Sequence, residues 1–187
     1  MIRFSPKTKD ELQSAVDLYY KNEHNSLNIY GPINTWDTSQ IIDMSRLFEN
    51  KREFNDDISN WDVSNVKNIN SMFLGASSFN KDISNWNVSN VINMSCMFYG
   101  ARSFNVDISL WDVSNVKDMI CMFSCALSFN QNISNWNISN VNTMEFMFYH
   151  ASSFNQDISN WNTKKVKEPY NMFYNCNINE EYKPKFK

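Results

Sequence analysis

FNKDISNWNVSNVINMSCMFYGARS, residues 79–103, is the clearest copy of a motif that recurs every 25 residues along the chain. All six tryptophans fall on this spacing: Trp36, Trp61, Trp86, Trp111, Trp136 and Trp161. A fixed period between about 20 and 50 residues is typical of repeat architectures, in which each unit buries its apolar face only against its neighbours. We therefore expect a stack of mutually dependent copies.

Within a copy, the apolar spacing changes midway. Ile83, Trp86 and Val88 alternate in a way that predicts a short strand, and the Trp86 indole should face inward. From Val91 to Ala101 the apolar residues follow a helical spacing, which predicts a short helix. The pattern predicts an α/β solenoid, a leucine-rich-repeat-like right-handed coil of about six 25-residue strand-plus-short-helix units.

Other segments are expected to close the two ends. Thr8 and Glu11 have capping-box spacing, and an apolar stripe follows, which predicts an amphipathic capping helix over residues 8–22. We expect an extended lead-in at 1–7 and a polar turn at 21–26, after which residues 27–30 lead into a partial first copy. The predicted organisation is an N-terminal cap (1–28), repeats over 29–176 and a C-terminal tail or cap (177–187). The repeats are assigned to 29–53, 54–78, 79–103, 104–128, 129–153 and 154–176.

Composition excludes several classes of function. The formal net charge of −3 gives no general attraction to nucleic acid or anionic membranes. No apolar run approaches the ~20 residues of a membrane-spanning helix, and the N-terminus lacks the apolar segment of a signal peptide. We therefore expect a cytoplasmic or virion-associated protein rather than a secreted one, either monomeric or associated end to end.

Two columns of polar side chains are expected at turns between copies. The asparagines at 55, 80, 105, 130 and 155 should satisfy backbone groups that the turns leave unpaired. Asp57, Asp82, Asp107 and Asp157 should accept hydrogen bonds within their turns, with cation binding as the alternative. We predict no cofactor and no metal site.

The residues carry no recognisable catalytic set, so we expect no enzyme. The four cysteines, Cys96, Cys121, Cys125 and Cys176, have neither disulfide-framework nor zinc-finger spacing. Cys96 and Cys121 share one repeat position and should therefore lie close together.

The exposed strand face is the predicted binding surface, because repeat proteins commonly bind partners across such extended faces. The candidate residues are Asp62, Asn85, Asn87, Leu110, Asp112, Asn135, Asn137, Asn160 and Asn162.

The block WNVSNVINMSCMFYGARSFNVDISLW, residues 86–111, resembles the repeat of BspA-like leucine-rich-repeat surface proteins, which is shared with mycoplasma lipoproteins, other bacteria, protists and large DNA viruses. The resemblance covers about residues 8–176 and implies surface display, adhesion or protein binding without catalytic residues. We expect a non-catalytic interaction or adhesion module with an unidentified protein partner. The alternative is a structural surface or virion component that acts through lateral packing.

Overall fold

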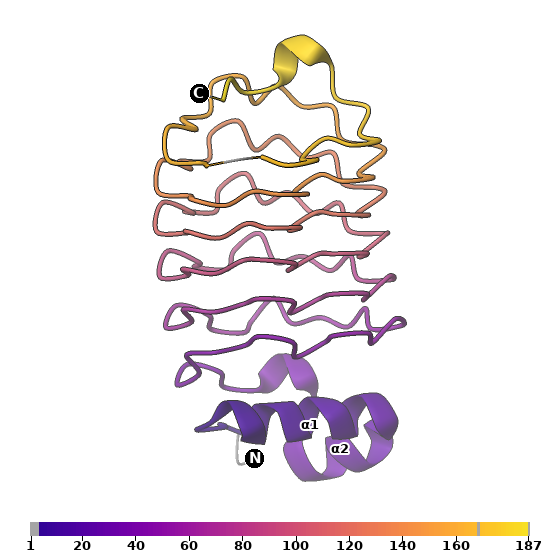
Figure 1. Ribbon diagram of the computed structural model, residues 1–187. Coiled ribbons are helices and arrows are strands. Elements are labelled where there is room, and N and C mark those ends of the chain that lie inside the picture. Colours follow the sequence, from indigo (N-terminus) through magenta and orange to yellow (C-terminus); the bar gives the residue numbers. More distant parts are fainter. Residues whose placement is uncertain (1–3, 168, 187) are drawn as a thin grey trace.

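The computed structural model describes residues 4–167 and 169–186. Figure 1 shows two α-helices beneath a stack of windings that follow one another along the chain. The helices are α1 (Lys9–Lys21) and α2 (Glu23–Tyr30). Two short 3-10 helices are η1 (Ile33–Thr35) and η2 (Glu180–Tyr182).

Helix α1 confirms the helix predicted over residues 8–22. The Thr8 side chain accepts a hydrogen bond from the Glu11 N–H at 3.2 Å, as expected for an N-cap. Its apolar stripe, which includes Leu12 and Val16, is buried. Lys51 forms an ion pair with Asp17 at 2.7 Å, which adds a polar contact between the first winding and α1. The helix therefore covers the N-terminal end of the stack.

Helix α2 corrects the prediction of a polar turn at 21–26, and it continues through residues 27–30. It begins after Asn22, whose side chain accepts the N–H of Asn25 at 3.0 Å, and ends at Gly31 with φ +72°. Only Ser26 of this helix is buried, and Ile29 is exposed. Helix α2 has no buried apolar stripe. Its sequence therefore lacks the helical spacing of apolar residues by which α1 was predicted.

The predicted α/β solenoid of leucine-rich-repeat-like strand-plus-helix units is wrong. Across the described part of residues 36–179, the chain forms turns and contains neither an α-helix nor a strand longer than one bridge. The bridges found are parallel and lie where each predicted helix begins. They join Asp43, Asn68, Asn93, Asp118 and Thr143 in succession.

Consecutive tight turns replace the predicted helix. In residues 71–76, alternate N–H groups donate to the next winding and the others donate to a carbonyl three residues back. For example, Ser71 donates to Ser95 at 2.9 Å, whereas Met72 donates to Ile69 at 3.2 Å. Each of these amides thus finds a carbonyl partner, as a buried backbone requires, without forming a helix or a sheet.

Left-handed backbone conformations explain why the helix does not form. Ser71 and Gly75 have φ values of +55° and +69°, and the equivalent residues of the other windings are also left-handed. A right-handed helix requires negative φ at every residue, so it cannot pass through these positions. Apolar side chains three or four residues apart still face the core. They do so because two successive turns bring the chain back to the core side of the winding.

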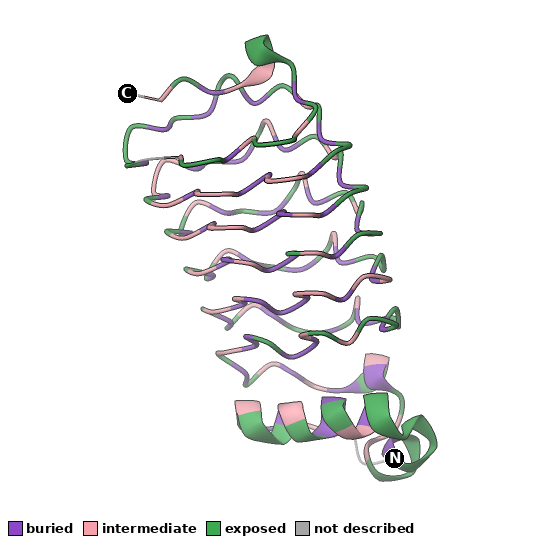
Figure 2. Ribbon diagram, turned by 45° about the vertical axis from the view of Figure 1, so that its right-hand side comes forward, coloured by how far each residue is buried: buried purple, intermediate pink, exposed green. Residues whose placement is uncertain are grey.

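The core is built from aromatic columns that run through the stack. The Phe73 and Phe98 rings stack with centroids 5.7 Å apart, and Phe98 repeats this contact with Phe123. All six tryptophans are buried, which confirms that the indoles belong to the core. Figure 2 shows buried and exposed residues alternating along each winding.

The chain end crosses the far side of the stack. The Ile158 N–H donates to the Tyr182 carbonyl at 3.0 Å, and the Thr163 hydroxyl donates to the Lys185 carbonyl. Ile178 is buried beneath this segment. In these contacts the tail lies against the last windings of the stack; residue 187 lies outside the described residues.

Candidate functional site

The predicted binding residues lie in two columns on either side of the buried tryptophans. One column holds Asn85, Leu110, Asn135 and Asn160, and the other holds Asp62, Asn87, Asp112, Asn137 and Asn162. All nine are exposed. The segments that present them are turns and extended chain rather than strands, so we call these nine residues the candidate face.

The Asp and Asn column is fixed by hydrogen bonds to its own turns. The Asp62 carboxylate accepts the Ser64 N–H at 2.9 Å, and Asp112 accepts the Ser114 N–H at 3.0 Å. Hydrogen bonds from the Ser114 side chain and backbone lower the pKa of Asp112. A carboxylate held this way is oriented before any partner arrives.

Leu110 is the exception in the other column. Its side chain is 90 % exposed, whereas the equivalent residues in neighbouring windings are the polar Asn85 and Asn135. It is flanked in sequence by Trp111, which is buried. An aliphatic side chain presented to water among asparagines loses the benefit of burial unless a partner covers it.

The Asp column at 57, 82, 107 and 157 makes the predicted turn contacts. Asp57 accepts the Ser59 N–H at 2.9 Å, and Asp157 accepts the Ser159 N–H at 3.0 Å. A hollow of about 320 Å³ beside this column contains one carboxylate, that of Asp157. Within the described residues, no three His, Cys, Asp or Glu side chains gather as metal ligands. Cation binding by this column therefore stays a prediction.

The asparagine column confirms the predicted ladder. The side-chain carbonyl of Asn80 accepts the N–H of Asn105 at 2.8 Å, and that of Asn105 accepts the N–H of Asn130 at 2.9 Å. The tail extends the ladder, because Asn155 accepts the N–H of Asn179 at 2.9 Å. These asparagines hold adjacent windings together.

The cysteines and histidines form separate contacts. Interaction with the Cys96 thiol raises the pKa of Cys121, which is consistent with the two residues lying close together. All four cysteines are free and half-buried. His150 lies 3.4 Å from the Asn175 amide, and His24 is exposed on α2.

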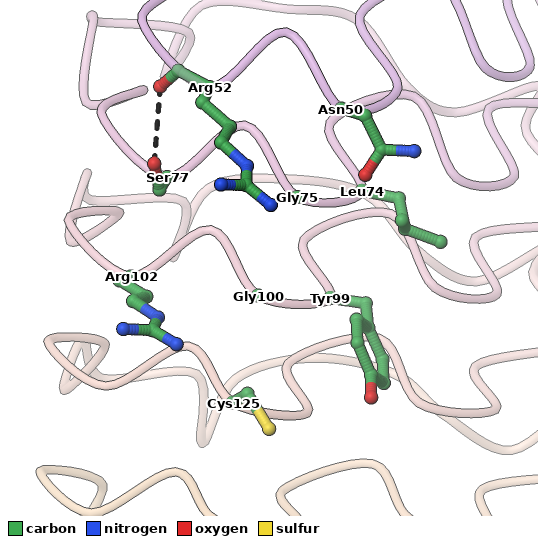
Figure 3. Close-up of a pocket in the computed structure, with 9 residues that line it drawn as sticks. All are labelled: Asn50, Arg52, Leu74, Gly75, Ser77, Tyr99, Gly100, Arg102 and Cys125. Carbon is green, nitrogen blue, oxygen red and sulfur yellow. Dashed lines mark hydrogen bonds between the residues drawn. The ribbon is translucent and has the colours of Figure 1, made fainter.

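Sequence reasoning missed a second hollow, of about 470 Å³, that spans several windings. Two arginines lie at one edge, apolar side chains at the other, and two glycines between them (Figure 3). The lining residues are Asn50, Arg52, Leu74, Gly75, Ser77, Tyr99, Gly100, Arg102 and Cys125. Two features of the sequence could have indicated this hollow. Glycine occupies one repeat position in two successive copies, and Arg52 and Arg102 share a second repeat position two residues further on.

The family model described as "Mycoplasma protein of unknown function, DUF285" matches residues 16–126 and again residues 87–185. The two matches overlap and together span residues 16–185, which include the whole of the predicted repeat region, 29–176. The comparison with curated proteins found no match. The comparison with solved structures also found none. In the described part of the chain, neither α-helix has the length and apolar character that crossing a bilayer requires.

Proposed function

This chain belongs to the DUF285 family of Mycoplasma proteins of unknown function, and we propose that it is a non-catalytic module that binds a protein partner through the candidate face. The observation that carries this proposal is Leu110, 90 % exposed among asparagines. We also propose that the family relationship extends to the BspA-like surface proteins, on the basis of residues 86–111.

The candidate face suits a protein partner for a second reason. Asp62 and Asp112 are already held in turns, so little side-chain freedom is lost when they accept a bond from a partner. Immobilising a flexible side chain at an interface costs about 0.5–1.5 kcal/mol, and pre-ordered groups avoid most of that cost. An apolar anchor surrounded by ordered polar groups is a common arrangement at interfaces.

Site-specific photocrosslinking tests the proposal. A benzophenone amino acid at position 110 should give one dominant adduct with a different protein in extracts of the native source. The matched control is the same substitution at Leu127, which is also an exposed leucine but lies outside the candidate face. Reversing the charge at Asp62 and Asp112 should reduce the adduct at position 110 at least fivefold.

The outcomes separate the proposal from its alternative. Equal adduct patterns from positions 110 and 127, or an adduct that ignores charge reversal at Asp62 and Asp112, contradict binding through this face. An adduct between two copies of this chain supports instead a structural component that acts through lateral packing.

A further inference from the structure

We propose that the hollow between Arg52 and Arg102 binds an oxyanion, a carboxylate or a phosphate, that is carried on an apolar group. This inference rests on the hollow itself and is independent of the proposed binding of a protein through the candidate face.

The hollow exists because two successive windings carry glycine at one repeat position. The equivalent residues elsewhere are Asn50, Cys125, His150 and Asn175, all of which carry a side chain at this position. A Cβ on Gly100 would meet nothing nearer than the Gly75 backbone at 3.8 Å, so the space beside it is open. At Gly75 the corresponding space is occupied by the Asn50 side chain, only 2.6 Å from where a Cβ would lie. The open volume is therefore concentrated beside Gly100.

Positive charge gathers at one edge of this space. Arg52 and Arg102 occupy the same position two windings apart, which places their backbones roughly 10 Å from each other. Between them lies Ser77, whose small side chain donates to the Arg52 carbonyl at 3.2 Å. Figure 3 shows both arginine side chains extending from this edge. The lining includes no carboxylate.

The two guanidinium groups are available to a ligand. Arg46 forms an ion pair with Glu49 at 3.7 Å. By contrast, within residues 4–167 and 169–186 neither Arg52 nor Arg102 has its guanidinium in an ion pair or side-chain hydrogen bond. Guanidinium groups keep their charge at any physiological pH and match carboxylate and phosphate oxygens with paired N–H donors. Two such groups at one edge of a concave surface favour a bound oxyanion.

The apolar edge of the hollow, opposite the arginines, determines which kind of chemical group can carry the oxyanion. Leu74 and Tyr99 line that edge, and Tyr99 is exposed. Figure 3 shows their side chains across the glycines from the arginines. A flat or aliphatic group lying on this edge would remove apolar surface from water while its charged end meets the arginines. A ligand that combines both features fits better than a free inorganic ion.

The three glycines of the chain provide a direct readout. In protein labelled with ¹⁵N only at glycine, Gly75 and Gly100 report on the hollow, and Gly31, at the end of α2, is an internal control. The probes are phenyl phosphate and phenylacetate, with benzyl alcohol as the uncharged control. We expect saturable shifts of the Gly75 and Gly100 amide signals with both anions and no shift of Gly31. The tighter anion identifies the ligand as phosphate or carboxylate.

Matched variants make the test specific. Replacing Arg52 and Arg102 together with glutamine should weaken binding at least tenfold, whereas Arg46→Gln should change it less than twofold. Gly100→Asn should block binding by filling the hollow, since asparagine tolerates left-handed φ. The proposal is overturned if neither anion gives saturable shifts, if benzyl alcohol gives equal shifts, or if the double arginine variant binds as well as the natural protein.

Discussion

The indole Nε1 of Trp111 donates a hydrogen bond to the backbone carbonyl of Ile83 at 3.2 Å, from one winding to the preceding one. Trp61, Trp86, Trp136 and Trp161 make the same bond to the equivalent isoleucine. Each buried indole therefore satisfies its only donor while its ring fills the core. This pairing explains why one tryptophan per copy is needed at that position, rather than any large apolar residue.

Trp111→Phe should lower the free energy of unfolding by about 1–3 kcal/mol, because the hydrogen bond is lost and a smaller ring fills the site. The Ile83 carbonyl keeps its bond from the Trp86 N–H at 3.1 Å, which limits the loss. Urea unfolding followed by circular dichroism measures the change. Leu110→Ala, next in sequence but exposed, should change stability by less than about 0.5 kcal/mol. Equal effects of the two substitutions would contradict the assignment.

Asn105→Ala should destabilise the protein by about 0.5–1.5 kcal/mol. The substitution removes the acceptor of the Asn130 N–H and of the Gln131 side-chain amide, which bonds it at 3.0 Å. Asn142→Ala is the control, because that side chain is exposed and makes no such bond between windings. If the two variants unfold at the same urea concentration, the asparagine ladder does not contribute to stability.

Gly100→Ala should cost about 1–2 kcal/mol, because alanine is strained at a φ of +67°. A Cβ there would meet only ordinary contacts, so the cost is conformational rather than steric. Gly100→Asn should cost less, since asparagine adopts left-handed φ more readily. Thermal unfolding of both variants tests the order; a more stable alanine variant would argue against the left-handed turn.

Acid should destabilise the protein through its turn carboxylates. Hydrogen bonds from the Ser109 backbone and side chain lower the pKa of Asp107 in the folded state. Its contribution to stability is therefore present above the unfolded pKa of about 3.9 and is lost as the pH falls through the folded pKa. Asp107→Asn should lower stability slightly at pH 7, because the charge-assisted hydrogen bonds are lost, and make its decline below about pH 5 less steep.

Asn132 provides the control for that experiment. It occupies the same repeat position and accepts the Ser134 N–H at 3.0 Å without a titratable group. Asn132→Asp should therefore add acid sensitivity to the same extent that Asp107→Asn removes it. Identical dependence of unfolding on pH in all three proteins would show that these turns do not couple stability to pH.

The sequence predicted the parts of the fold that depend on side-chain burial. Trp86 and Phe98 recur at a fixed spacing, and burial of such large rings dominates the energy of a stacked core. Helix α1 was predictable because a capping residue and an apolar stripe coincide there. Asn80 and Asn105 were predictable as a ladder because an amide can both donate and accept across equivalent turns.

The backbone path could not be predicted in the same way. The left-handed residue that ends one turn is Ser71 in one winding, Cys96 in the next and Phe146 further along, and none of these residue types indicates positive φ. Apolar spacing alone does not distinguish a short helix from consecutive tight turns. The hollow at Gly100 was missed for a related reason, because its edges come from residues that are distant in sequence and become neighbours only when the windings stack.

The stack depends on indoles that point inward and donate a hydrogen bond to the preceding winding. Hydrogen exchange of the six indole N–H groups, followed by NMR on protein labelled with ¹⁵N at tryptophan, tests this directly. We predict that the indoles of Trp61, Trp86, Trp111, Trp136 and Trp161 exchange slowly, near the rate set by global unfolding. Exchange of these indoles within seconds of transfer to heavy water would contradict their burial and their hydrogen bonds between windings.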